Sequence, residues 1–310
     1  MLQNSTLRGS AEMAAAMLIS GTIGWFVVMS GLPVADVVFW RCVFGAATLL
    51  AICAALGVLR PGTVSARVLL IASIGGVAIV ANWLLLFAAY SRASISIATV
   101  VYNTQPFMLL AFGVLLFGER VTLRKLGWLG LAFVGMLLVV LVRPNASYAG
   151  AQYLVGILLA LGAAFLYAVA AVAAKKLTGT PPHLIALIQV TVGIAMLLPL
   201  ANLSSPPSGG WQWSMVAVVG VVHTGLMYVL LYGAIQKLPT SLTASLSYIY
   251  PVAAVLVDFI AFGHRLQALQ ILGSLAILLA AAGMNLGWSF RVPARSALPF
   301  SRPGRFRGMV

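Results

Sequence analysis

Two apolar stretches of the chain each carry polar and aromatic side chains at helical spacing, and each group ends in a proline. The residues recur at intervals of three and four positions, which places them on one face of a helix. They are Thr99, Tyr102, Asn103 and Pro106 in the first stretch, and Ala244, Ser247, Tyr248 and Pro251 in the second. A proline inside a helix leaves the carbonyl oxygen four residues earlier without its N–H donor. That oxygen could receive a substrate ammonium group, although the same proline could instead produce a kink that only shapes packing.

Aromatic residues at equivalent positions of two other apolar runs indicate the walls of a binding site. Trp83 falls opposite Tyr228 when the two halves of the chain are aligned, and Tyr228 and Tyr232 share one helical face. Tyr167, in a further run, is another aromatic candidate. Such rings suit a planar ligand or a cation. The alternative is that these side chains anchor helices at the membrane–water interface.

Three other polar side chains inside the apolar runs could contact a substrate or carry a proton. His223 could hydrogen-bond a carboxylate or titrate near neutral pH, and Asn82 is a second polar candidate. Asp258 could take up and release a proton if it is buried among apolar residues, or could lie at a solvated rim. We therefore treat Asp258 and His223 as coupling candidates. The predicted substrate-binding residues are Asn82, Trp83, Tyr102, Asn103, Tyr167, His223, Tyr228, Tyr232 and Tyr248.

The remaining charged and sulfur-containing residues indicate no catalytic or metal site. Glu119 is followed by a cluster of basic residues, so we expect an ordinary salt bridge there. Cys42 and Cys53 would be about 16 Å apart along one helix, too far for a disulfide. The chain has three scattered histidines and no paired Cys or His spacing typical of a metal site. We therefore expect no metal, no cofactor and no enzymatic activity.

The composition identifies the solvent in which these elements fold. Hydrophobic residues make up 62% of the 310 residues and charged residues only 7%, and the mean hydropathy is +1.09. A soluble domain carries roughly a quarter charged residues, so this chain must be solvated by lipid. The net charge of +14 is distributed over short loops between apolar runs, which indicates membrane topology and excludes a nucleic-acid-binding face.

Apolar runs of about twenty residues predict membrane-spanning helices. The first run could also be a signal peptide, but it has a counterpart in the second half, and cleavage would leave that counterpart without a partner. We expect ten spans, near residues 11–30, 36–57, 68–90, 94–117, 124–142, 153–174, 183–201, 212–235, 239–262 and 267–289.

The loop charges predict the orientation of the chain in the membrane. With the amino terminus in the cytoplasm, most Lys and Arg residues fall in cytoplasmic segments. Only Arg92, Arg143 and Arg265 fall in the opposite loops, and Arg41 lies within the second run. Because basic residues accumulate in cytoplasmic loops, we expect both termini to be cytoplasmic.

A duplication defines the domain organisation. Residues 75–120 and 220–265 align without a gap and end in PFMLLAFGVLLFGER and PVAAVLVDFIAFGHR. Five spans in each half is an odd number, so the second half must enter the membrane from the opposite side. We therefore expect an all-α membrane protein of two inverted five-helix repeats around a central cavity. The predicted segments are a cytoplasmic amino terminus (1–10), a first repeat (11–142), a linker (143–152), a second repeat (153–289) and a disordered basic tail (290–310).

The duplicated signature resembles the EamA family of the drug/metabolite transporter superfamily. The residues that carry the match are Pro106 to Arg120 with Gly127 and Gly135, and Pro251 to Arg265 with Gly273 and Gly283. Phe39-Trp40-Arg41 is similar to a further feature of the family. The second half departs from the pattern, because His264 replaces the acid that the first half has at Glu119. The chain also resembles the YddG-like aromatic amino-acid exporters.

This resemblance implies an inner-membrane transporter that exports aromatic or other neutral amino acids and related metabolites by alternating access. The expected partners are that small-molecule substrate and the lipid bilayer, with the chain a monomer or a dimer. Competing functions are export of other metabolites or drugs, a passive channel, and an intramembrane enzyme. Nucleotide sugars would require several basic residues in the cavity, and only Arg41 is a candidate. An enzyme would require a nucleophile or metal constellation that the sequence lacks.

Overall fold

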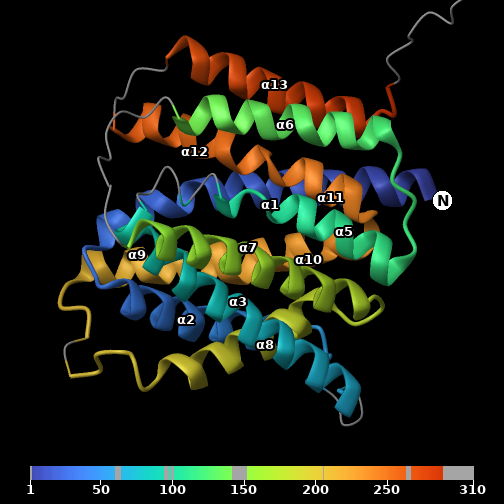
Figure 1. Ribbon diagram of the computed structural model, residues 1–310. Coiled ribbons are helices and arrows are strands. Elements are labelled where there is room, and N and C mark those ends of the chain that lie inside the picture. Colours follow the sequence, from blue (N-terminus) through green and yellow to red (C-terminus); the bar gives the residue numbers. More distant parts are fainter. Residues whose placement is uncertain are drawn as a thin grey trace, which may run out of the picture.

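The computed structural model is helical wherever the chain forms regular structure within the residues that it describes (Figure 1). The described residues are 2–59, 64–93, 98, 101–141, 152–204, 206–262 and 267–288. The predicted linker lies almost entirely outside these ranges, and the predicted tail entirely so. The first half contains α1 (Leu2–Ser30), α2 (Val34–Ala55), α3 (Ala66–Ala93), α5 (Gln105–Phe117) and α6 (Leu123–Leu141).

The second half follows the same order with more interruptions. It contains α7 (Tyr153–Lys176), α8 (Pro182–Leu197), α9 (Gly210–Gly220), the π-helix η1 (Val221–Leu226), α10 (Met227–Lys237), α11 (Thr240–Ser247), α12 (Ile249–Phe262) and α13 (Ala268–Asn285). Each of the ten predicted spans therefore coincides with helical residues.

Six helical stretches of the described chain are long and apolar enough to cross a membrane by themselves. They are Ser5–Ser30, Val34–Ala55, Ala66–Leu86, Tyr153–Lys176, Gly210–Lys237 and Ala268–Asn285. Helices α5 and α8 are apolar but shorter. The chain is thus a multi-pass helical protein with two repeats, and the number of ten crossings stays a prediction.

Helix α1 begins earlier than the sequence indicated. It starts at Leu2 and not near residue 11, so the predicted amino-terminal segment is helical from its second residue. Its 29 residues extend over about 43 Å, which exceeds the roughly 30 Å of a bilayer's hydrocarbon core. We attribute the extension to helix formers such as Leu7, Ala11 and Glu12, which continue the helix into the polar region.

A short interruption of the helix precedes each of the two prolines. A turn at Asn103 and Thr104 precedes α5, and α11 and α12 are separated at Tyr248. Pro106 and Pro251 lie in the first turn of the helix that follows each break. A first-turn residue needs no N–H donor, so a proline is well tolerated there.

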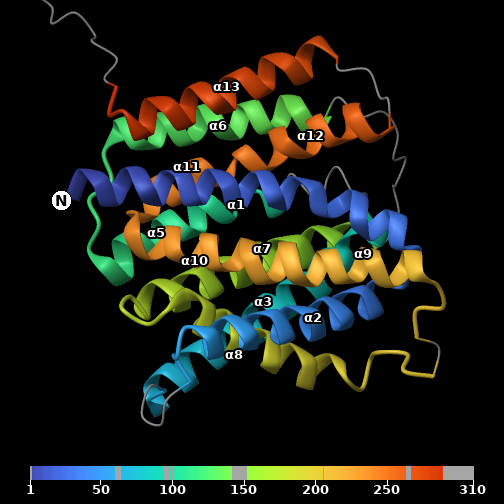
Figure 2. The ribbon, with the colours of Figure 1, turned by 180° about the vertical axis from the view of Figure 1, so that it is seen from behind.

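The helices of one half pack mainly against those of the other half (Figures 1 and 2). Helix α1 packs on α10 and α12, and its counterpart α7 packs on α3 and α5. Helices α2 and α8 contact each other, as do α6 and α13. Figures 1 and 2 also show the start of α1 and the end of α13 at the same end of the bundle.

The contact between α6 and α13 depends on Gly135 and Gly273. A Cβ on Gly135 would lie 2.7 Å from the Gly273 carbonyl oxygen, so the two backbones touch. In contrast, a Cβ on Gly127 or Gly130 would have no neighbour within 4 Å. Helix packing in lipid relies on such close approach of small residues.

Candidate functional site

A cavity of about 170 Å³ lies among helices of both halves. One water needs only about 10–15 Å³ measured in this way, so the space fits a small organic molecule. The aromatic residues that line it are Trp83, Tyr102, Tyr167, Tyr228 and Tyr250. Its polar lining consists of Ser20, Arg41, Asn103, Gln105 and Ser247. Aliphatic and methionine side chains complete the wall.

Five of the nine predicted substrate-binding residues line this cavity. They are Trp83, Tyr102, Asn103, Tyr167 and Tyr228. The Trp83 and Tyr228 rings make an edge-to-face contact with centroids 6.3 Å apart, and the Tyr102 and Tyr167 rings make another at 6.2 Å. The rings therefore support one another and hold fixed orientations.

Two predicted tyrosines lie behind the cavity wall. The Tyr232 hydroxyl donates a hydrogen bond to the Gln189 side chain, and its ring packs against Tyr228 at a centroid distance of 5.2 Å. The Tyr248 hydroxyl donates to the backbone carbonyl oxygen of Asn103 at 2.8 Å, so it joins the two helix breaks. Neither residue is part of the lining described above.

The predicted polar residues Asn82 and His223 are also not part of the cavity lining. Asn82 Nδ2 donates to the Ala163 carbonyl oxygen at 2.6 Å and thereby joins α3 to α7. His223 Nε2 lies 2.7 Å from Thr22 Oγ1, between η1 and α1. The Asp258 side chain lies outside the described part of the chain. Within the described residues, no three His, Cys, Asp or Glu side chains are grouped to hold a metal ion.

Arg41 lines the cavity but is not among the substrate-binding residues predicted from the sequence. Arg41 is only 4% exposed, and its guanidinium carbon lies 4.0 Å from the centroid of the Trp83 ring. Arg41 Nε donates to Thr224 Oγ1 at 3.1 Å. A charged residue inside an apolar span is expensive and usually functional, and that signal was visible in the sequence.

The π-helix brings Thr224 to Arg41. Thr224 Oγ1 donates its proton to the Val219 carbonyl oxygen at 3.1 Å, so its lone pairs remain available to accept from Arg41. Two glycines allow the required approach of α2. A Cβ on Gly45 would lie 2.6 Å from Thr224 Cγ2, and a Cβ on Gly220 would collide with Phe44. Single π-turns of this kind occur frequently at functional sites.

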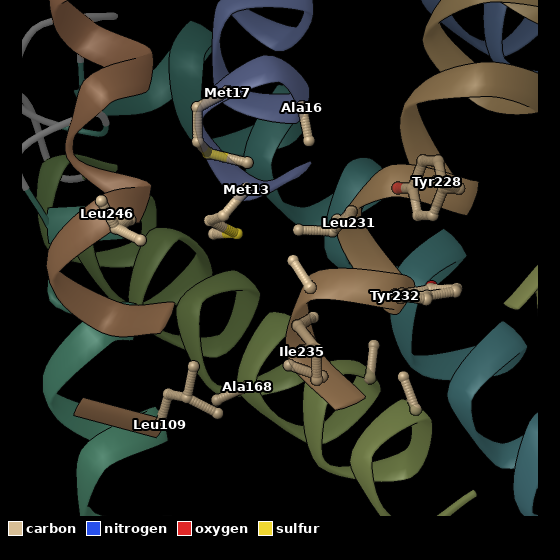
Figure 3. Packing of buried hydrophobic residues seen from close by; sticks show 14 of the residues in the cluster. Met13, Ala16, Met17, Leu109, Ala168, Tyr228, Leu231, Tyr232, Ile235 and Leu246 are labelled. Carbon is tan, nitrogen blue, oxygen red and sulfur yellow. The ribbon is translucent and has the colours of Figure 1, made fainter. Parts of the chain in front are cut away.

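Buried apolar side chains of five helices lie next to the cavity-lining residues (Figure 3). Each member is buried and lies one turn or less beyond a cavity-lining residue of its own helix, toward the end of the bundle where α1 begins. We call this set the closing layer: Met13, Leu109, Ala168, Ile235 and Leu246.

Beyond the closing layer, Glu119 connects the two halves of the chain. Its carboxylate accepts hydrogen bonds from Thr240 N at 2.9 Å, from Thr240 Oγ1 at 2.7 Å and from Lys175 Nζ at 2.9 Å. The expected salt bridge therefore exists, but with Lys175 of α7 and not with the neighbouring basic residues. Gly113 permits this contact, because a Cβ there would collide with the Thr240 hydroxyl.

Glu119 lies in the loop between α5 and α6. The contacts described above determine its protonation state. Burial raises the pKa of this carboxyl, but the hydrogen bonds from Thr240 and Lys175 outweigh burial and hold the pKa below its ordinary value. A second ion pair, Lys237 Nζ to Glu12 Oε2 at 2.6 Å, joins α10 to α1 at the same end.

Comparisons of the sequence with known proteins identify a family and several relatives. The model of the EamA-like transporter family matches residues 8–141 and 154–286, which together are most of the chain. An uncharacterized transporter of Bacillus subtilis, YxxF, is 28% identical over 89% of this chain and 88% of its own length. A probable amino-acid metabolite efflux pump of Salmonella typhimurium is 26% identical over 63% of this chain and 68% of its own length.

A solved crystal structure of another protein has the same fold. It superimposes with a TM-score of 0.80, covering 94% of this chain and 99% of that one, at 21% sequence identity. The two segments that the family model matches therefore lie within one known fold.

Proposed function

The chain belongs to the EamA-like transporter family, and from this premise we propose that it exports aromatic and other neutral amino acids from the cell. It is a membrane transporter and not an enzyme. The observation that carries the proposal is the cavity wall, which combines four tyrosines and a tryptophan with neutral hydroxyl and amide groups. Rings of this kind bind a planar apolar side chain, and the polar groups can bind the amino-acid backbone.

We further propose that the ten helical segments form two inverted repeats. The helix contacts support this arrangement. Helix α1 of the first half packs on α10 and α12 of the second half, and the equivalent helix α7 of the second half packs on α3 and α5 of the first half. Equivalent residues of the two repeats also contact each other across the centre. Trp83 contacts Tyr228, and Tyr248 bonds to Asn103. Such self-pairing is expected for residues close to a pseudo-two-fold axis.

The closed end of the cavity is proposed to be the cytoplasmic end. The loop charges favour cytoplasmic termini, and each residue of the closing layer lies along its helix on the side of a lining residue toward the end where α1 begins. In alternating access, this layer and the Glu119 contacts would separate when the cavity opens inward. His223 and Asp258 remain the candidates for proton coupling. We propose the inner membrane of the cell as the location.

Transport of labelled amino acids by the purified chain in proteoliposomes tests the proposal. We expect counterflow of phenylalanine, tyrosine or tryptophan, and we expect Tyr228→Ala to weaken the apparent affinity about 2- to 10-fold through loss of a ring contact. Tyr153→Ala, at the start of α7 and away from the lining, is the matched control. A folded protein that moves none of the three would refute the amino-acid assignment and leave the family unchanged.

A further inference from the structure

The cavity contains one charged side chain among its lining residues, and that charge is not neutralised by the described part of the protein. The sixteen lining residues include Arg41 but no Asp, Glu, Lys or His. Within the described ranges, the ion pairs that carboxylates form go to Arg8, Lys175 and Lys237, and none goes to Arg41.

Within the residues that the structure describes, the partners of Arg41 are neutral. Nε donates to Thr224 Oγ1, the guanidinium lies over the Trp83 ring, and the Tyr228 hydroxyl lies beside the same group. These contacts make burial of the guanidinium tolerable and fix its plane. They leave its full positive charge facing the cavity, because neither a hydroxyl nor an aromatic ring carries a compensating charge.

We propose that Arg41 binds the carboxylate of the transported molecule and so selects compounds that carry one carboxylate over their amides and amines. The planar guanidinium offers five N–H donors in a fork that matches the two oxygens of a carboxylate. One cation also matches one negative charge. A phosphate dianion would call for further basic groups, and the lining supplies none.

The surroundings of Arg41 place the rest of such a molecule. Trp83 and Tyr228 flank the guanidinium, so a ring attached near the carboxylate would lie along the aromatic wall. The neutral oxygens of Asn103, Gln105 and Ser247 also line the cavity and can accept from an ammonium group. The ring, the carboxylate and the ammonium group of an aromatic amino acid therefore each have a partner among the lining residues. This inference rests on the proposed function for the amino-acid skeleton, but the carboxylate contact does not depend on transport.

Ligand-induced thermal stabilisation of the purified chain in detergent separates these ideas. The probes are phenylalanine, phenylalaninamide, 3-phenylpropionate and phenyl phosphate, which share a ring and differ in charge. We expect phenylalanine to bind at least about tenfold more tightly than its amide, since a hydrogen-bonded charge pair contributes roughly one to two powers of ten. We expect phenylpropionate to bind more tightly than phenyl phosphate.

Variants identify the residue responsible. Arg41→Gln should reduce the preference for phenylalanine over its amide to about one, and Arg41→Lys should restore only part of it, because lysine lacks the planar fork. Gln105→Ala, which leaves the charge in place, should keep the preference. The wild-type panel decides the matter even if the Arg41 variants fail to fold.

Each possible result of these binding experiments tests one part of the proposal. Equal binding of phenylalanine and its amide by the wild-type chain would overturn the carboxylate contact while leaving the amino-acid assignment in place. Tighter binding of phenyl phosphate would overturn it in favour of a phosphate ligand. Binding of phenylpropionate without transport of any amino acid would keep the carboxylate contact and refute the proposed function. An unchanged preference in a folded Arg41→Gln protein would assign the selectivity to another group.

Discussion

Glu119→Gln should open the closed end of the cavity more often. In the structure, the Glu119 carboxylate bonds to the backbone and hydroxyl of Thr240 and to Lys175, so one side chain joins α7 and α11 to the loop after α5. In the proposed alternating access, these bonds would break when this end of the cavity opens. The substitution keeps the size and one acceptor oxygen, but it removes the charge and replaces the other acceptor with an N–H₂ donor.

The magnitude follows from the kind of bond that is lost. Hydrogen bonds to charged groups contribute about 1.5–3 kcal/mol each, and neutral ones about 0.5–1.5 kcal/mol. Conversion of the charged contact to a neutral one should therefore destabilise the closed state by roughly 2 kcal/mol, which is about a thirtyfold change in the opening equilibrium. Arg8→Gln is the matched control, since the Arg8 side chain is 75% exposed and its pair with Glu12 is worth little.

Cysteine labelling measures this equilibrium. Leu246→Cys places a thiol in the closing layer, in a chain whose native Cys42 and Cys53 are replaced by alanine. A membrane-impermeant maleimide then reacts from the cytoplasmic face in proportion to the open population. We expect labelling about thirtyfold faster with Glu119→Gln and within twofold of the parent with Arg8→Gln. Equal rates for both variants would refute the role assigned to Glu119.

The pH dependence of the same labelling follows from the lowered pKa of Glu119. A carboxyl with a depressed pKa stabilises the closed state above its ordinary pKa of about 4.3, and this stabilisation is lost only as the pH falls through the lowered value. The contribution of Glu119 should therefore be constant between about pH 5 and pH 8. A steep change of the labelling rate within that window that is absent from Glu119→Gln would contradict the assignment.

Two further predictions concern stability and can be checked by thermal unfolding in detergent. Gly135→Ala should destabilise the protein by about 1–3 kcal/mol, because the added Cβ would lie 2.7 Å from the Gly273 carbonyl oxygen, whereas Gly130→Ala should be tolerated; equal melting temperatures would contradict the close contact. Tyr248→Phe should cost about 1 kcal/mol through loss of the bond to the Asn103 carbonyl oxygen, and an unchanged melting temperature would show that this bond contributes no net stability.

Several features of this protein are local properties of the chain, and the sequence by itself determined them. Composition alone required lipid as the solvent, and the duplicated Pro106 and Pro251 segments indicated the two repeats and the family. Alignment of the repeats also paired Trp83 with Tyr228, which are in contact in the structure. Such features depend on the order and type of residues and not on which way a helix faces.

Only the tertiary structure decided which polar side chains face the cavity. In a membrane protein, lipid and protein core are both apolar, so the hydrophobic period of a helix does not identify its inner face. For this reason Tyr232, Asn82 and His223 could not be separated from Tyr228 and Tyr102 in the sequence. The contact between Arg41 and Thr224 was likewise hidden, because the π-helix that contains Thr224 has no periodic signal of its own. Long-range contacts of this kind arise from the way helices meet, and no single segment contains them.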